Sequence, residues 1–280
     1  AYQNLYWCII ISSFIDLFFL GVTCWFMKKY PNKTLKEVLV ENFGVVITKF
    51  LYTLLFIYFF SKSVLILKET HNYFLNNLFD ELNWFYFIGP YLLLIGYMGY
   101  KTIRTIGRSV ELFYWLIAAA LILGLILPFA KFKLDNLLPF LNDGFEPIMK
   151  GVFKGNFAYG DYLVLIMMFG KIKFTEKTPK RLIKYWAFTS IFVLVFYIAF
   201  AGVFNIMGLS QSPAISNLPL NASFPSTVSR LDWVTIIIWT ITLIFQTGVY
   251  MLFALECFIN ITGITNKSVA LTINVILLFV

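Results

Sequence analysis

The sequence predicts an all-α polytopic membrane protein. Of its 280 residues, 60% are hydrophobic and only 13% are charged, whereas a soluble domain is about 45–50% apolar and about 25% charged. The mean hydropathy is +0.81, and a water-soluble globule of this length has no core large enough to bury so much apolar surface. Long apolar runs follow one another along the chain without the alternation of barrel strands, so we expect helices.

The apolar runs predict seven membrane spans and one partial span, because a helix needs about 20 apolar residues to cross a bilayer. The third and fifth runs are short, and the last run is a stub that reaches the final residue. The predicted spans are 5–27, 44–67, 84–100, 112–130, 157–169, 185–207, 233–259 and a stub from Val269. A short amphipathic helix is predicted over 32–42, with Thr34 as its cap.

The charge distribution predicts the orientation of these spans. The net charge of +8 comes from 22 Lys and Arg against 14 Asp and Glu, and in a soluble protein it would indicate a nucleic-acid partner. Here most basic residues lie in alternate loops, which the positive-inside rule places in the cytoplasm. We therefore expect no nucleic-acid partner, an outer location for the first residues and a cytoplasmic location for 28–42.

Residues 144–170, GFEPIMKGVFKGNFAYGDYLVLIMMFG, form the most informative stretch. Three glycines weaken a helix here, since each costs about 1 kcal/mol relative to alanine. One interpretation is a discontinuous helix with a first half near 146–156, an unwound strip at 157–160 and a second half from Asp161. Its free backbone groups would then contact a zwitterionic ligand. The alternative is a re-entrant outer loop followed by a short tilted span.

Ionisable residues within the predicted spans are a second signal, because a charge at mid-bilayer costs at least about 2.5–3.5 kcal/mol. Lys62 lies deep in its span and shares a helix face with Tyr58, four residues earlier. It could pair with Asp161 or bind a ligand carboxylate. On the seventh span, the amide of Gln246 could line a pocket, and the neighbouring threonines are expected to hydrogen-bond between helices.

The sequence offers little for catalysis or metal binding. Its three cysteines lie inside apolar runs without ligand spacing, and its one histidine, His71, is predicted to be a solvated side chain in an outer loop. We predict no catalytic residues, no metal site and no cofactor, and we do not expect an enzyme.

Four segments, in this order along the chain, resemble the spore germination permease family, the B subunits of nutrient germinant receptors. They are KKYPNKTLKEVL, NLLPFLNDGFEPIMKG, FAYGDYLVLIMMF and RLDWVTIIIW. That family is similar to the amino acid–polyamine–organocation transporters, which have ten spans in two inverted repeats of five. The resemblance implies one transmembrane domain over 1–280, with 1–130 from the first repeat and 131–280 from the second. It also favours the discontinuous helix, and it implies that the first and last spans lie outside these 280 residues.

The resemblance further implies a site and a function. The ligand site would comprise Tyr58, Lys62, Phe157, Tyr159, Gly160, Asp161 and Gln246. Lys62 and Gln246 depart from the smaller or neutral side chains of alanine-sensing members, which favours a larger or more polar nutrient. The implied function is a nutrient sensor, for an amino acid above all, in the bacterial cell membrane or the spore inner membrane. Its implied partners are the lipid bilayer and the A- and C-type receptor subunits.

Two other functions remain open at the level of sequence. The chain could be an ion-coupled transporter that moves an amino acid by alternating access. It could also be an ion channel that a nutrient opens.

Overall fold

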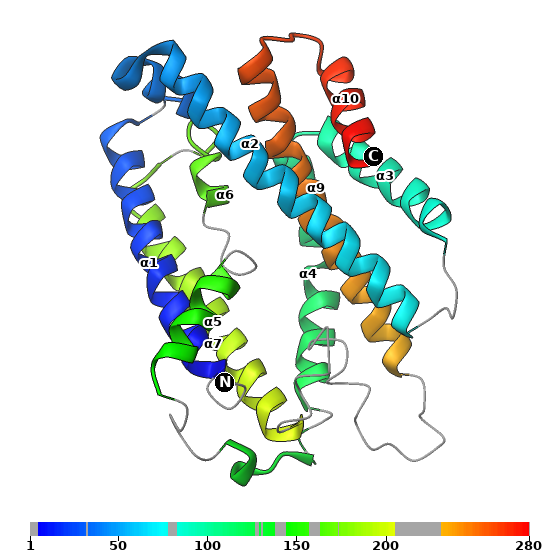
Figure 1. Cartoon of the computed structure of the whole chain (residues 1–280). Helices are drawn as coiled ribbons and strands as arrows, with labels where there is room; N and C mark the ends of the chain where they lie inside the picture. The colour runs from blue at the N-terminus through cyan, green and yellow to red at the C-terminus, as the bar shows by residue number, and fades with distance from the viewer. Residues whose placement is uncertain are drawn as a thin grey trace. The chain divides into compact units, whose positions relative to one another are not determined.

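A computed structural model describes residues 5–31, 33–77, 83–126, 129, 131–137, 144–156, 163–172, 174–204 and 231–279, and within them all regular structure is helical (Figure 1). The helices are α1 Leu5–Lys29, α2 Leu35–Asn77, α3 Trp84–Tyr100, α4 Ile103–Ile126, η3 Leu134–Leu137, α5 Glu146–Asn156, α6 Leu163–Ile166, α7 Thr178–Phe204, α9 Leu231–Thr262 and α10 Lys267–Phe279.

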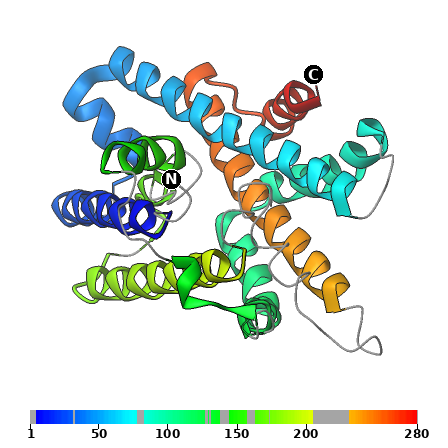
Figure 2. The same ribbon diagram turned by 60° about the horizontal axis from the view of Figure 1, so that its bottom comes forward.

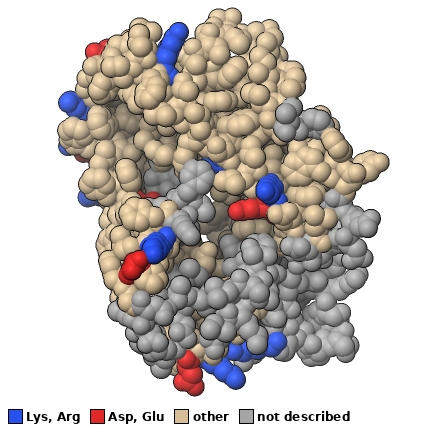
Figure 3. All heavy atoms as spheres, in the orientation of Figure 1, with Lys and Arg blue, Asp and Glu red and all other residues tan. Residues whose placement is uncertain are grey.

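Five of the described helices are long and apolar enough to cross a membrane, namely α1, α2, α4, α7 and α9. On the face shown in Figure 3, charged side chains are sparse among uncharged atoms. Large apolar side chains such as Phe18 and Leu112 are mostly exposed, at 67% and 83%, as expected where lipid replaces water. The all-α polytopic membrane fold that the sequence predicts is thereby confirmed.

The described chain forms two compact units, and each unit is discontinuous in sequence. Unit 1 comprises Ala1–Leu35 and Ala120–Thr235, and unit 2 comprises Lys36–Ala119 and Ile236–Val280. Each unit takes residues from both sides of the repeat boundary implied at 130/131. The two repeats themselves stay a prediction.

In unit 1, α1 packs against α5 and α7 (Figures 1 and 2). The indole N–H of Trp186 on α7 donates to the Ser13 carbonyl of α1 at 3.1 Å. The Cys8 thiol of α1 donates to the Ile148 carbonyl of α5 at 3.4 Å. Polar atoms of neighbouring helices thus complement the apolar packing, as transmembrane segments require.

Helix α5 covers Glu146–Asn156, the range predicted for the first half of the discontinuous helix, and the discontinuity itself stays a prediction. The strip at 157–160 lies outside the described residues. Helix α6 covers only Leu163–Ile166, and turns follow it to residue 172. The prediction of a span over 157–169 is therefore wrong in its described part, because residues 163–169 do not form one continuous helix. Apolar composition indicates affinity for lipid, but it does not show that a helix is continuous.

Helix α2 joins two segments that the sequence separates. Gly44, with φ 77° and ψ 174°, kinks the helix between its amphipathic first part and its membrane span. Glycine is nearly alone in tolerating this backbone conformation. The helix then continues to Asn77, so the predicted loop after residue 67 is wrong. Polar residues lower hydropathy there, but Lys and Glu are good helix formers.

Unit 2 has an apolar core shared by α2, α3, α9 and α10. Its buried members are Leu67, Ile88, Tyr91, Leu92, Ile95, Met251 and Leu278. Lys267, the first residue of α10, donates through Nζ to the carbonyls of Tyr100 at 2.5 Å and Lys101 at 3.1 Å. A cation at the carboxyl end of α3 satisfies carbonyls that the helix leaves unpaired. This core fixes the positions of α2 and α9, which carry the candidate site.

Candidate functional site

Lys62, on the membrane span of α2, is the centre of the candidate site. Its side chain is only 3% exposed. Among the residues whose burial the structure describes, Asp16 in unit 1 is the other buried charged side chain. An ammonium group at this depth costs several kcal/mol unless its surroundings stabilise it. The groups around Lys62 therefore indicate which kind of ligand this site could bind.

Two tyrosine rings flank the Lys62 ammonium. Its Nζ lies 5.6 Å from the ring centroid of Tyr58 on α2 and 6.0 Å from that of Tyr250 on α9. At these distances the negative face of an aromatic ring attracts a cation, by about 0.5–2 kcal/mol. Tyr58 reaches Lys62 because residues four apart share one face of a helix.

Buried phenylalanines hold these rings in place. Phe59 is fully buried, and its ring stacks with Tyr250 at a centroid distance of 6.3 Å. Phe253, also fully buried, contacts Phe59 at 5.6 Å. The aromatic packing between α2 and α9 thus fixes the tyrosine next to Lys62.

Gln246 joins the same group through Tyr250. Its Nε2 donates to the Tyr250 hydroxyl at 3.2 Å. Because that hydroxyl oxygen accepts from the amide, its own hydrogen is directed elsewhere and can be donated. Tyr250 is 3% exposed, whereas Gln246 is exposed. We define the Lys62 cluster as Tyr58, Lys62, Gln246 and Tyr250, all of which lie in unit 2.

The structure brings together three of the predicted site residues, Tyr58, Lys62 and Gln246, by way of Tyr250. The sequence reasoning missed Tyr250, although it lies four residues after Gln246, the same spacing that relates Tyr58 to Lys62. The other predicted site residues, Phe157, Tyr159, Gly160 and Asp161, lie outside the described residues. Their part in the site, including the pairing of Lys62 with Asp161, stays a prediction.

Hydroxyl groups near the cluster have structural roles. Thr247 is fully buried, donates to the Leu243 carbonyl at 2.7 Å and contacts the Tyr91 hydroxyl at 3.5 Å. The predicted hydrogen bond between helices is therefore confirmed for Thr247, whereas Thr242 donates to the Ile238 carbonyl of its own helix at 2.9 Å. Hydroxyls that donate to backbone carbonyls support helix packing rather than nucleophilic chemistry.

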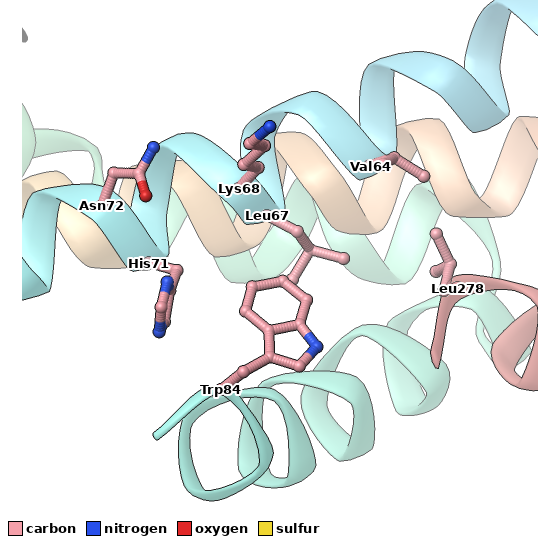
Figure 4. A pocket seen from close by; sticks show the side chains of 7 residues that line it. All are labelled: Val64, Leu67, Lys68, His71, Asn72, Trp84 and Leu278. Atoms are coloured by element: carbon pink, nitrogen blue, oxygen red, sulfur yellow. The ribbon is translucent and has the colours of Figure 1, made fainter. Parts of the chain in front are cut away.

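A separate pocket of about 380 Å³ lies along the later part of α2 (Figure 4). Its lining comes from α2, α3 and α10 and comprises Val64, Leu67, Lys68, His71, Asn72, Trp84 and Leu278. Nine residues at about 100° each place His71 about 180° around the helix from Lys62. The pocket is thus on a different face of α2 from the Lys62 cluster.

His71 departs from its predicted environment. It lies within α2 rather than in a loop, and it is half-buried. Its ring packs against Trp84 at 4.9 Å and Phe87 at 5.2 Å. The prediction of a solvated loop histidine is wrong because α2 extends beyond the apolar run and carries His71 onto the aromatic start of α3.

Comparison with known proteins gives one family. The model of a family described as spore germination protein matches residues 3–280. No match was found among curated proteins. The family match covers both units and every residue of the Lys62 cluster.

Proposed function

This chain belongs to the spore germination protein family, and from that premise we propose that it is the membrane subunit that senses a small nutrient and so triggers germination. Membership in this family and the five apolar helices make it a germination-related, multi-pass integral membrane protein of the cell or spore membrane. The observation that carries the proposal is the Lys62 cluster, a buried cation surrounded by polar and aromatic groups on two packed helices.

The cluster has the composition of a ligand site. Small-molecule sites are mostly apolar and aromatic, with a few polar groups that fix the orientation of the ligand. Here Phe59 and Phe253 supply the apolar wall, while Lys62 and Tyr250 supply the polar groups. We include Phe157, Tyr159, Gly160 and Asp161 in the proposed site, with an amino acid as the first nutrient to test.

Sensing requires that the nutrient bind one conformation of the protein better than another. Shifting a two-state equilibrium from 1:99 to 99:1 needs about 10⁴-fold tighter binding to the favoured state. The Lys62 cluster joins α2 to α9, so a ligand bound there acts on two helices at once. We propose that this shift is passed to A- and C-type receptor subunits without covalent chemistry, in keeping with a family that is not an enzyme family.

Ligand-induced stabilisation tests the proposal. The full-length protein, purified in detergent, is screened against amino acids and sugars by thermal unfolding. A ligand at 100 times its Kd stabilises the folded state by about 2.7 kcal/mol, so a true nutrient raises Tm by several degrees. If no nutrient raises Tm at saturating concentration, alone or in the assembled receptor, the sensor proposal is wrong.

Transport is the second candidate, because the matching family is a permease family. Uptake of the radiolabelled nutrient into proteoliposomes that contain the isolated chain separates the two functions. A sensor binds the nutrient without concentrating it inside. Robust accumulation driven by an ion gradient would replace the sensor proposal with ion-coupled transport.

A further inference from the structure

We propose that the pocket along the later part of α2 (Figure 4) binds an anionic phospholipid, with the phosphate group beside Lys68 and an acyl chain at the apolar end. The inference goes beyond the proposed function, because it assigns a second ligand to a different face of α2. Three features of the pocket lead to it, namely its level in the membrane, the order of polarity along its wall and the charge of its lining.

The first feature is the level of the pocket in the membrane. The apolar run of α2 ends at Leu67, and Lys68 begins the polar continuation of the helix. Trp84, the first residue of α3, also lines the pocket, and Figure 4 shows its ring rising from α3 toward Leu67. Tryptophan is enriched where the hydrocarbon core of a bilayer meets the headgroups. Both helices therefore place the pocket at this boundary.

The second feature is the order of polarity along α2. Val64, Lys68 and Asn72 are four residues apart, so they form one row on the helix, and all three are exposed where they line the pocket. Over about 12 Å of helix, the row changes from an aliphatic side chain to an ammonium and then to an amide. A phospholipid has the same order, since its chains lie in the hydrocarbon core and its phosphate lies in the headgroup layer.

The inner end of the pocket has an apolar wall. Leu67 of α2 and Leu278 of α10 are buried, and both belong to the apolar core of unit 2. An acyl chain packs against such a wall, whereas a free phosphate ion gains nothing from it. The pocket volume of about 380 Å³ lies in the range of about 300–1,000 Å³ for small-molecule sites. The pocket thus favours an amphiphile over a wholly polar ligand.

The third feature is the charge of the lining. Lys68 is a cation, and none of the described residues that line the pocket is acidic. Asn72 and Trp84 carry N–H donors, and phosphate oxygens accept hydrogen bonds from such groups. The His71 ring packs edge-on against Trp84 at 4.9 Å and so holds the indole at the pocket wall. The lining therefore complements an anionic headgroup better than a zwitterionic one, whose ammonium group Lys68 repels.

The experiment measures which phospholipid the protein retains. The full-length protein is purified in detergent, freed of lipid and titrated with phosphatidylglycerol or with phosphatidylcholine of the same acyl chains. Native mass spectrometry counts the bound lipid. Glycerol 3-phosphate and inorganic phosphate are titrated in parallel by calorimetry, because they present phosphate without a chain. These titrations separate a lipid ligand from a free phosphate.

Two pairs of variants locate the site. Lys68→Met removes the charge at the pocket, and Lys49→Met removes the charge of another exposed lysine of α2, which does not line the pocket. Val64→Trp fills the apolar end of the pocket. Leu65→Trp places the same ring at the next residue, which is equally exposed but does not line the pocket.

We expect the wild type to bind phosphatidylglycerol at least about 5-fold more tightly than phosphatidylcholine. This ratio is equivalent to about 1 kcal/mol, the effect of one lysine near anionic headgroups. Lys68→Met loses the preference, and Lys49→Met keeps it. Val64→Trp weakens the binding of both lipids because the acyl chain loses its place, and Leu65→Trp binds both as the wild type does. If Val64→Trp does not fold, the two lysine variants decide the test.

Other results would overturn the inference. Equal binding of the two lipids by the wild type, or a preference that persists in Lys68→Met, shows that the pocket does not recognise an anionic headgroup. Unchanged lipid binding in Val64→Trp excludes the acyl chain from the pocket. Binding of glycerol 3-phosphate or inorganic phosphate as tight as that of phosphatidylglycerol assigns the site to free phosphate. None of these outcomes affects the proposed function, which the nutrient-induced change in Tm tests separately.

Discussion

Tyr250 contacts two different partners with two parts of one side chain, the Lys62 cation with its ring and the Gln246 amide with its hydroxyl. The substitution Tyr250→Phe keeps the ring and removes the hydroxyl. The packing of its ring against Phe59 is kept, and the hydrogen bond that is lost is the one from the Gln246 amide. This residue therefore separates ligand recognition from stability.

We expect Tyr250→Phe to raise the nutrient concentration for half-maximal germination about 2- to 10-fold, since one lost hydrogen bond costs about 0.5–1.5 kcal/mol. The measurement is a germination dose response, with membrane abundance checked by immunoblot. Tyr97→Phe, at an exposed tyrosine of α3, is the matched control and leaves the response unchanged. An unchanged response in Tyr250→Phe would remove its hydroxyl from the site.

Gln246 and Tyr159 are tested in the same way. Gln246→Ala removes the donor to Tyr250, and Tyr159→Ala removes a side chain that the sequence assigns to the break in the discontinuous helix. Each substitution should shift the half-maximal nutrient concentration while the protein still inserts in the membrane. If both leave that concentration unchanged, the assignment of these residues to the pocket is wrong.

Part of the site could be predicted from the sequence because helix geometry links residues four apart. Lys62 was predicted with Tyr58 on one face, and the cation–ring contact at 5.6 Å confirms that they lie together. Tyr250 was missed because a tyrosine in an apolar span has the composition of a packing or anchoring residue. Its role depends on α9 packing against α2, which is a tertiary contact that periodicity does not encode.

At the scale of the helix, Gly44 is the residue that separates the two parts of α2. Its φ of 77° and ψ of 174° are strained for any L-amino acid with a side chain. Gly44→Ala should lower the free energy of unfolding by about 1–3 kcal/mol, measured by thermal or denaturant unfolding in detergent.

Gly107→Ala is the matched control for Gly44→Ala. Both positions have open space where a Cβ would lie, but Gly107 is inside α4 and has no positive φ. Alanine is about 1 kcal/mol more favourable than glycine within a helix, so this control should be neutral or stabilising. Equal effects at the two positions would show that the kink does not need the glycine conformation.

Gly248 allows the close approach of α9 to α3. A Cβ at this position would lie 2.6 Å from Cε of Met98 and 3.0 Å from its Cβ. Gly248→Leu therefore overpacks the interface and should cost about 1–3 kcal/mol in unfolding free energy. Unfolding of the purified protein measures the effect. A leucine tolerated at Gly248 as well as at Gly107 would contradict this packing.

Helix boundaries were predictable where polar residues interrupt the apolar run and the helix together. The predicted span 84–100 coincides with α3 because Asn83 caps it, accepting from the Phe85 N–H at 2.9 Å, and Lys101 ends it. At α2 the apolar run and the helix end at different residues, since hydropathy falls at Lys68 while the helix continues to Asn77. Hydropathy reports where a segment leaves the membrane and not where its hydrogen bonding stops.

For the whole molecule, the basic loops predict the orientation in the membrane. The positive-inside rule places the loop of Lys131 outside and the loop of Lys177 in the cytoplasm, and both residues are exposed. Single cysteines are introduced at these two positions after Cys8, Cys24 and Cys257 are replaced by alanine. A membrane-impermeant maleimide added to intact cells should label Lys131→Cys at once, and Lys177→Cys only after the membrane is opened. The reverse pattern would invert the orientation.

The central claim is that a nutrient is recognised at the Lys62 cluster of this germination protein. The most direct test compares spores that carry the wild-type chain, Lys62→Met or Lys49→Met at equal membrane abundance. The nutrient concentration for half-maximal germination should rise at least about 10-fold in Lys62→Met, equivalent to about 1.4 kcal/mol of lost binding free energy, and stay unchanged in Lys49→Met. An unchanged concentration in Lys62→Met, or an equal rise in both variants, would contradict the claim.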